Sequence, residues 1–294
     1  MHFCSVLLLS VRAELPASET AALVDLFDGL GGKKWRNGTG VGRWLEGDPC
    51  ENRWYGVRCN DNGTHVIEFY PSQAQSGNSL DGTIRASIKN LTQLQHLVVS
   101  NAFVHTGKLS GTIPAEIAEL KELRCVYLSH NRLSGTIPAS IASMTNMQGF
   151  FARDNDLSGA MPDVSAWSDL RSFDLDTNRL TGDLSSFAGL KKLAVLVVHN
   201  LQLKGKLPRE LCDVYQCDAW DNEFACPLPP ANNTIPHPVA NSSCCGVRKC
   251  LNGSQRAVAP VIAPPTSPRY HAGADPGDDR PYGPGYICQC HTPL

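Results

Sequence analysis

The chain has 294 residues, with 26 lysines and arginines against 28 aspartates and glutamates, which gives a formal net charge of −2 at pH 7. This balance argues against a nucleic-acid-binding surface, which would show an excess or a stripe of basic residues. Hydrophobic residues make up 42% and charged residues 18%, so the chain is too apolar to be disordered as a whole.

Residues 1–13 are predicted to be a secretory signal peptide. An apolar run from Phe3 to Val11 leads into Val11-Arg12-Ala13, which resembles a cleavage site. Six Asn-x-Ser/Thr sequons follow, and together with clustered cysteines they favour a secreted, glycosylated chain. The expected glycosylation sites are Asn37, Asn62, Asn90, Asn232, Asn241 and Asn252. No later stretch reaches the roughly 18 apolar residues of a membrane span.

Residues 14–64 open with an amphipathic segment. Ser18–Gly29 predicts a helix with Ser18 as the N-cap and Gly29 near the C-terminal end. Its apolar positions share one helical face: Ala22, Leu23, Leu26, Phe27 and Leu30. Two tryptophans and two cysteines follow, at Trp44, Cys50, Trp54 and Cys59. Nearby His or Cys partners with zinc-ligand spacing are missing, which argues against a zinc site.

A sequence repeat fills residues 65–211 and continues beyond them. One unit reads Leu120-x-x-Leu123-x-x-Val126-x-Leu128-x-x-Asn131-x-Leu133-x-Gly135-x-Ile137-Pro138. The Val126 position recurs, at steps of 21 to 24 residues, as Phe150, Phe173, Leu196 and Cys217. The asparagine recurs as Asn155, Asn178 and Asn222, whereas Leu201 takes its place once. Each alternating apolar pair predicts a short strand, and about seven stacked units would share one continuous core.

These residues resemble the leucine-rich repeat family in its plant-type form, which has L-x-G-x-I-P in the second half of each repeat. The resemblance implies an α/β solenoid, a horseshoe of about seven parallel-strand repeats with a helical N-terminal cap over residues 14–64 and a disulfide-rich C-terminal cap. The segment from Trp44 to Cys59 is similar to the N-terminal cap of this family, which implies a Cys50–Cys59 disulfide. The recurring asparagine is expected to bond buried backbone groups, with a break at Leu201.

Residues 212–250 are expected to form the last repeat and a cysteine-rich C-terminal cap. Six cysteines there allow fifteen pairings, which the sequence does not decide: Cys212, Cys217, Cys226, Cys244, Cys245 and Cys250. Residues 251–294 are rich in proline and glycine and are predicted to be a disordered tail. Removal of the signal peptide leaves an odd number of cysteines, and Cys125 is the first candidate for a free thiol.

The sequence carries no recognisable catalytic, nucleotide-binding or zinc-protease motif, so we expect no enzyme activity, cofactor or metal site. The acids Asp154, Asp174 and Asp176 are of the residue type that attracts a cation. The pattern favours instead a solvated acidic patch neutralised by Arg153.

The strand positions that point away from the core predict a ligand-binding concave face. Aromatic residues and an arginine flanked by acids are typical of protein or peptide contacts, although aromatic residues also favour strands for their own sake. The expected ligand-binding residues are Tyr70, Tyr127, Phe151, Arg153, Asp174, Asp176, His199 and Trp220.

The leading functional hypothesis is a secreted or cell-surface protein that binds a protein, peptide or glycan on its concave face, as a receptor does. Fold alone does not give function, so this hypothesis depends on the resemblance and the outward residues. Two alternatives stay open: an inhibitor of a secreted cell-wall hydrolase, and a structural cell-surface or wall glycoprotein. Neither a nucleic-acid partner nor a membrane span is expected in this chain, and the sequence leaves the oligomeric state open.

Overall fold

The computed structural model describes residues 14–35, 44–71, 80–100 and 108–225. The predicted signal peptide (1–13) and tail (251–294) therefore lie outside the described residues. The same holds for four expected cysteine positions and four sequons: Cys226, Cys244, Cys245, Cys250, Asn37, Asn232, Asn241 and Asn252.

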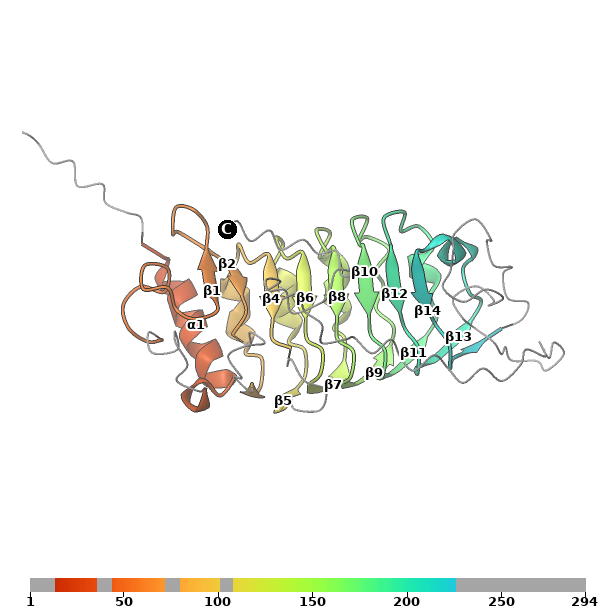
Figure 1. Cartoon of the computed structure of the whole chain (residues 1–294), viewed down its shortest axis with the longest axis horizontal. Coiled ribbons are helices and arrows are strands. Elements are labelled where there is room, and N and C mark those ends of the chain that lie inside the picture. Colours follow the sequence, from red (N-terminus) through yellow and green to blue (C-terminus); the bar gives the residue numbers. More distant parts are fainter. Residues whose placement is uncertain (1–13, 36–43, 72–79, 101–107, 226–294) are drawn as a thin grey trace, which may run out of the picture.

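The described residues form a solenoid in which each coil adds one strand to a continuous sheet (Figure 1). The sheet has eight strands, of which the first is antiparallel to the second and the other seven run parallel. This confirms the predicted solenoid of about seven repeats. The strands are β1 (Val57–Cys59), β2 (Val66–Phe69), β4 (His96–Val98), β6 (Cys125–Tyr127), β8 (Gly149–Phe151), β10 (Ser172–Asp174), β12 (Val195–Val197) and β14 (Gln216–Asp218).

The register of this sheet follows the sequence repeat. Val126 is paired with Leu97 on one side and Phe150 on the other, and the ladder continues through Phe173 to Cys217. These side chains point into one continuous core, because alternate residues of a strand face opposite sides of the sheet. The neighbouring strand residues therefore face away from the core.

A second, seven-stranded sheet lies along another side of the coils, and the sequence analysis did not predict it. Its strands are β3 (Asp81–Gly82), β5 (Lys108–Gly111), β7 (Arg132–Thr136), β9 (Asp156–Ala160), β11 (Arg179–Gly182), β13 (Gln202–Gly205) and β15 (Glu223–Phe224). The repeat glycine is needed here: Gly159 has φ +85°, and an added Cβ would lie 2.7 Å from Thr136 Cγ2.

Short 3-10 helices complete most coils, and each of the five outside the cap sends one or two apolar side chains into the core. The helices are η3 (Ala86–Asn90), η4 (Ala115–Glu119), η5 (Ala139–Ser143), η6 (Ser185–Phe187) and η7 (Arg209–Asp213), besides η1 (Gly32–Lys34) in the cap. Pro114, Pro138 and Pro208 precede three of them in extended conformation, where a missing N–H leaves no ladder bond unmade.

The recurring asparagine links consecutive coils. Asn178 Nδ2 donates to the carbonyls of Ala152 and Leu175, at 2.9 Å each, and its Oδ1 accepts the Leu157 N–H at 2.9 Å. Asn131, Asn155 and Asn222 repeat the pattern of donation. Leu201 is buried at the equivalent place and carries no polar group, so the asparagine ladder breaks there as predicted.

The N-terminal cap covers the first coil with helix α1 (Ala17–Gly29) (Figure 1). The predicted apolar face is buried, but the predicted N-cap was wrong: the helix begins at Ala17 after Pro16, and Ser18 lies in its first turn. Proline favours this early start, because its fixed φ suits the entry to a helix.

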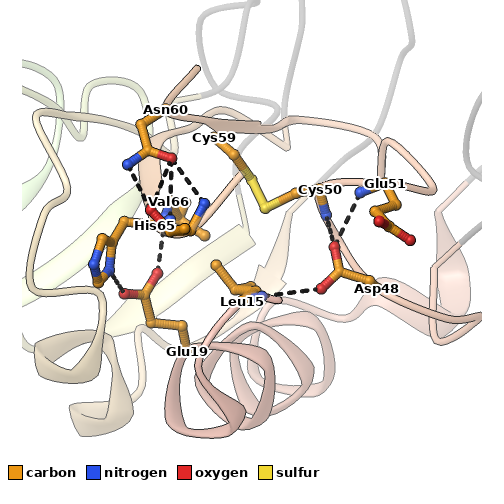
Figure 2. The surroundings of a disulfide bond; sticks show 10 residues. Leu15, Glu19, Asp48, Cys50, Glu51, Cys59, Asn60, His65 and Val66 are labelled. Carbon is orange, nitrogen blue, oxygen red and sulfur yellow. Dashed lines mark hydrogen bonds and ion pairs between the residues drawn. A yellow bond between two sulfur atoms is a disulfide. The ribbon is translucent and has the colours of Figure 1, made fainter. Parts of the chain in front are cut away.

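Two connections fasten the cap, and Figure 2 shows both. The Cys50–Cys59 disulfide implied by the resemblance is present. The buried Glu19 carboxylate accepts the Val66 N–H at 2.8 Å, and its other oxygen lies 2.6 Å from His65 Nδ1. Helix α1 is thereby joined directly to the start of β2.

Candidate ligand-binding face

The concave face is defined here as the side of the parallel sheet opposite the core. Three columns of side chains run across it from coil to coil. The register places Tyr127, Phe151 and Asp174 side by side in the middle column. The third column lies two residues further along each strand and contains Arg153, Asp176 and His199.

The aromatic part of this face is buried. Tyr127 and Phe151 stack with their ring centroids 4.5 Å apart and their planes 7° apart. Their exposed fractions are only 4% and 1%, and they form a cluster with Cys125 that is separate from the main core. These positions were expected to face solvent because they point away from the core. That expectation was wrong, because a side chain on the outer side of a sheet can still be buried by other contacts.

Cys125 also departs from the prediction. It occupies the first outward position of β6 and is disulfide-bonded, as are Cys212 and Cys217. The expectation of a free thiol was wrong, because counting cysteines shows that one is left over but not which one.

Arg153, Asp174 and Asp176 form a charged cluster beside the aromatic pair. Arg153 Nη1 lies 3.9 Å from Asp174 Oδ2, and Arg153 Nε lies 3.4 Å from Asp176 Oδ1. Both carboxylates are buried, so the prediction of a solvated acidic patch was wrong. Burial raises the pKa of Asp174 well above its usual value, and the adjacent Asp176 adds to the shift, while Arg153 opposes it.

Asp154 does not join Asp174 and Asp176 in the structure. Asp154 Oδ2 lies 3.0 Å from His130 Nδ1, and Asp154 has φ +54°. It therefore turns toward the neighbouring coil's histidine. Across the described residues, no group of three or more His, Cys, Asp or Glu side chains is arranged to hold a metal ion.

His199 and Trp220 extend the charged cluster toward the last coils. Their rings stack with centroids 4.1 Å apart, and His199 Nε2 lies 3.3 Å from Asp176 Oδ2. Burial lowers the pKa of His199, although Asp176 and Asp218 act in the opposite direction. The side chains of Arg153 and His199 keep 26% and 16% exposure, so this end of the concave face is open to a ligand.

Besides Arg153 Nε and Asp176 Oδ1, which form the ion pair described above, three buried polar atoms of the concave face have no hydrogen-bond partner among the described residues: the hydroxyls of Ser129 and Ser172 and the Nδ1 of His199. Ser129 and Ser172 are 1% and 0% exposed, so their hydroxyls lie below the surface of the concave face.

The structure brings together Arg153, Asp174, Asp176, His199 and Trp220, and places the Tyr127–Phe151 pair beside them. Tyr70 lies apart, half-buried at the N-terminal end of the middle column, with Val98 between it and Tyr127 in the register.

The N-terminal end of the first outward column was not predicted from the sequence. Glu68 and His96 are neighbours there, with 4.0 Å between Glu68 Oε1 and His96 Nδ1, and Arg58 Nη1 donates to Glu68 Oε1 at 3.0 Å. Burial lowers the pKa of His96 to about 4, and Arg124 and Arg58 add to the shift. The signal was available, because these residues precede the core position of each repeat, as Cys125 does.

Comparison with known proteins agrees with this architecture. The leucine-rich repeat family model matches residues 122–144. The ectodomain of the plant membrane receptor kinase GASSHO1/SCHENGEN3 from Arabidopsis thaliana, in complex with CASPARIAN STRIP INTEGRITY FACTOR 2, is similar with 25% identity and a TM-score of 0.61, over 72% of this chain and 25% of that one. A search of curated proteins found no match.

Two further solved structures share the fold. The PEPR1–AtPEP1 structure has 23% identity and a TM-score of 0.60, over 80% of this chain and 31% of that one. Pollen Receptor Kinase 3 has 22% identity and a TM-score of 0.52, over 75% of this chain and 99% of that one. This chain thus spans about a quarter of GASSHO1/SCHENGEN3 and under a third of PEPR1.

The chain thus contains a leucine-rich repeat at residues 122–144 and has the fold of plant leucine-rich repeat receptor ectodomains. Among the helices in the described ranges, none has the length and apolar composition needed to span a bilayer.

Proposed function

We propose that this protein is a receptor-like recognition module that binds a peptide at the charged end of its concave face. The binding site would consist of Arg153, His199 and Trp220, above the buried carboxylates of Asp174 and Asp176; Tyr127 and Phe151 are buried and Tyr70 lies apart, so they are not included. The proposal depends above all on one observation: the side chains of Arg153 and His199 stay 26% and 16% exposed on a face whose aromatic part is buried.

An extended peptide can pair with these partly exposed groups. Every peptide residue brings a carbonyl, and nearly every one brings an N–H, so a strand-like ligand can bond the guanidinium of Arg153 and the imidazole of His199. The stacked His199 and Trp220 rings offer a flat apolar surface for one ligand side chain. Trp and Arg are also the residues most often found at the energetic centres of protein interfaces.

The charges on this surface favour a ligand with a basic group. One guanidinium, of Arg153, faces Asp174 and Asp176, and Asp218 lies in β14, two strands along from Asp174. A ligand cation near the carboxylates would favour their charged forms, which burial disfavours.

The structural neighbours support this class of function. Two of them are the structures of GASSHO1/SCHENGEN3 in complex with CASPARIAN STRIP INTEGRITY FACTOR 2 and of PEPR1–AtPEP1. We propose by extension that this chain is secreted or exposed at the cell surface. Asn62 is exposed and Asn90 is half-buried, so glycosylation is proposed first at Asn62.

A displayed library of random 12-residue peptides, selected on the immobilised full-length protein, tests the proposal. We expect selected peptides to lose at least tenfold in affinity when Arg153→Gln or Trp220→Ala is introduced. Arg179→Gln is the matched control, because Arg179 lies in β11 of the second sheet and its exposed side chain pairs with Asp156.

Selected peptides that bind all three variants as tightly as the original protein would overturn the proposed site. The same holds if the selection enriches no peptide above the level of a blank surface. Circular dichroism of each variant checks that the fold is retained.

A further inference from the structure

A polar cavity of about 530 Å³ lies in the N-terminal cap beside the Cys50–Cys59 disulfide. Its lining comes from Glu14, Asp48, Cys50, Glu51, residues 53–63 and Tyr70. Cavities of a few hundred Å³ are the size that proteins use for small ligands. This cavity borders β1, whereas the proposed peptide site approaches β14, and these strands are the two ends of the main sheet. The cavity is therefore separate from the peptide site.

The charges around the cavity disfavour an anion and suit a sugar. Four lining residues are acidic and two are basic: Glu14, Asp48, Glu51, Asp61, Arg53 and Arg58. A phosphate or sulfate would be repelled by the excess of carboxylates. A neutral ligand rich in hydroxyl groups can donate to carboxylates and accept from guanidinium groups. Two half-buried tyrosines in the lining, Tyr55 and Tyr70, add aromatic surface for the apolar face of a sugar ring.

One residue of the lining can carry a sugar covalently. Asn62 is exposed and begins the sequon Asn62-Gly63-Thr64. Its turn is held by hydrogen bonds, because the Gly63 N–H donates to the Asn60 carbonyl at 2.9 Å and Asn60 Oδ1 accepts the Thr64 N–H at 2.8 Å. A Cβ on Gly63 would lie 3.9 Å from Cys50 Cβ, so the turn lies against the disulfide. Asn62 is thus held at the wall of the cavity.

We propose that Asn62 carries an N-linked glycan whose first sugar residues lie in this cavity. The proposal rests on the glycosylation of Asn62 put forward above with the secreted location, and it adds where the glycan binds. A ligand tethered by a short linker has an effective concentration of about millimolar at its site. Weak hydrogen bonds to groups such as Glu51, Arg53 and Asp61 are then enough to keep the sugar in place.

The attachment is a group transfer from a lipid-linked sugar diphosphate. Asn62 Nδ2 forms a bond to the anomeric carbon of the first sugar and loses one proton. The bond from that carbon to the diphosphate oxygen breaks, and the lipid diphosphate leaves with the bonding electrons.

Mass spectrometry of the full chain, produced in cells that glycosylate secreted proteins, measures the occupancy of Asn62. Trypsin cleaves after Arg58 and Arg85, and the sequon at Asn62 is the only one in peptide 59–85. We expect this peptide to carry a glycan in most molecules. An unmodified Asn62 would overturn both this proposal and the proposed glycosylation.

Hydroxyl-radical footprinting of the same protein tests where the glycan lies. Asn62→Gln should raise the oxidation of Tyr55 at least twofold, because the variant lacks the sugar that covers the cavity. Asn90→Gln is the matched control, since it removes a sequon in η3, outside the cavity lining, and should leave Tyr55 oxidation unchanged. Tyr215, which is 70% exposed, serves as the internal reference.

Enzymatic removal of the glycan from the folded original protein should produce the same rise at Tyr55 without any substitution. Unchanged Tyr55 oxidation after both treatments, with Asn62 occupied in the untreated protein, would overturn the placement in the cavity while leaving the glycosylation standing. Peptide selection reports separately on the proposed function, because its site at Arg153, His199 and Trp220 does not include Asn62.

Discussion

At the scale of single residues, burial decides the protonation of the concave face. His96 occupies the first outward position of β4, and its side chain is 11% exposed. A protonated His96 would be repelled by Arg124 and Arg58. Burial raises the pKa of the nearby Glu68, which makes its negative charge less favourable as well. The neutral imidazole is therefore the form that the fold prefers.

This preference predicts a loss of stability in acid. The pKa of His96 is about 4 in the folded protein, against the ordinary histidine value of 6.5 in the unfolded chain. As the pH falls from 6.5 toward 4, His96 binds a proton in the unfolded chain but not in the folded chain. The free energy of unfolding therefore falls. The expected contribution is about 2–3 kcal/mol between pH 7 and pH 4.5.

Urea unfolding of the original protein and of His96→Gln at the two pH values measures this contribution. The variant should lose less stability in acid, because glutamine does not titrate. Glu68 is present in both proteins, so the difference between them reports on His96. Equal losses in the two proteins would show that His96 does not carry the effect.

The sequence predicted the contacts of the repeat asparagines but not those of Tyr127 and Cys125. The asparagine ladder was predictable, because each asparagine bonds the backbone of adjacent coils and the repeat fixes their spacing. The burial of Tyr127 and the bonding of Cys125 were not, since both depend on contacts outside their own coils. A periodic pattern specifies which way a side chain points, but not what later covers it.

At the scale of elements, helix α1 is tied to the first coil by one buried carboxylate. Glu19 is 2% exposed and serves both His65 and the Val66 N–H (Figure 2). Glu19→Ala should lower the free energy of unfolding by about 2–3 kcal/mol, because it leaves a buried N–H without an acceptor. Chemical denaturation followed by tryptophan fluorescence measures the change.

Asp25→Ala on the same helix is the matched control. Asp25 accepts a hydrogen bond from the Ser87 hydroxyl at 2.6 Å, but at the exposed surface. Its removal should change stability by no more than about 0.5 kcal/mol. If the two variants lose equal stability, the cap is not held by the Glu19 contacts.

Elements with a strong periodic signal were predicted well, and those without one were missed. The strands of the main sheet alternate apolar and outward residues, which the repeat makes visible. The second sheet consists of segments such as Arg132–Thr136, with one buried leucine among polar residues and a glycine. Such a segment pairs because the coil before it has placed a partner alongside, so its own sequence carries little strand signal.

At the scale of the whole molecule, stability should be highest in the middle of the stack. Each coil contacts mainly its two neighbours, so an inner coil is held from both sides and an end coil from one. Amide hydrogen exchange should therefore be at least tenfold slower in β10 than in β14 after correction for intrinsic rates. Equal protection in the two strands would indicate that the solenoid opens only as a single unit.

Strand β1 has a consequence for association between molecules. A parallel solenoid grows by adding strands at its ends, and an unpaired edge strand is a template for another chain. Here β1 runs antiparallel to β2, is only three residues long and has a register shift between Arg58 and Cys59. A second molecule would meet a short, irregular, charged edge in place of β2. The N-terminal cap thus ends the sheet at an edge that is a poor template for a further strand.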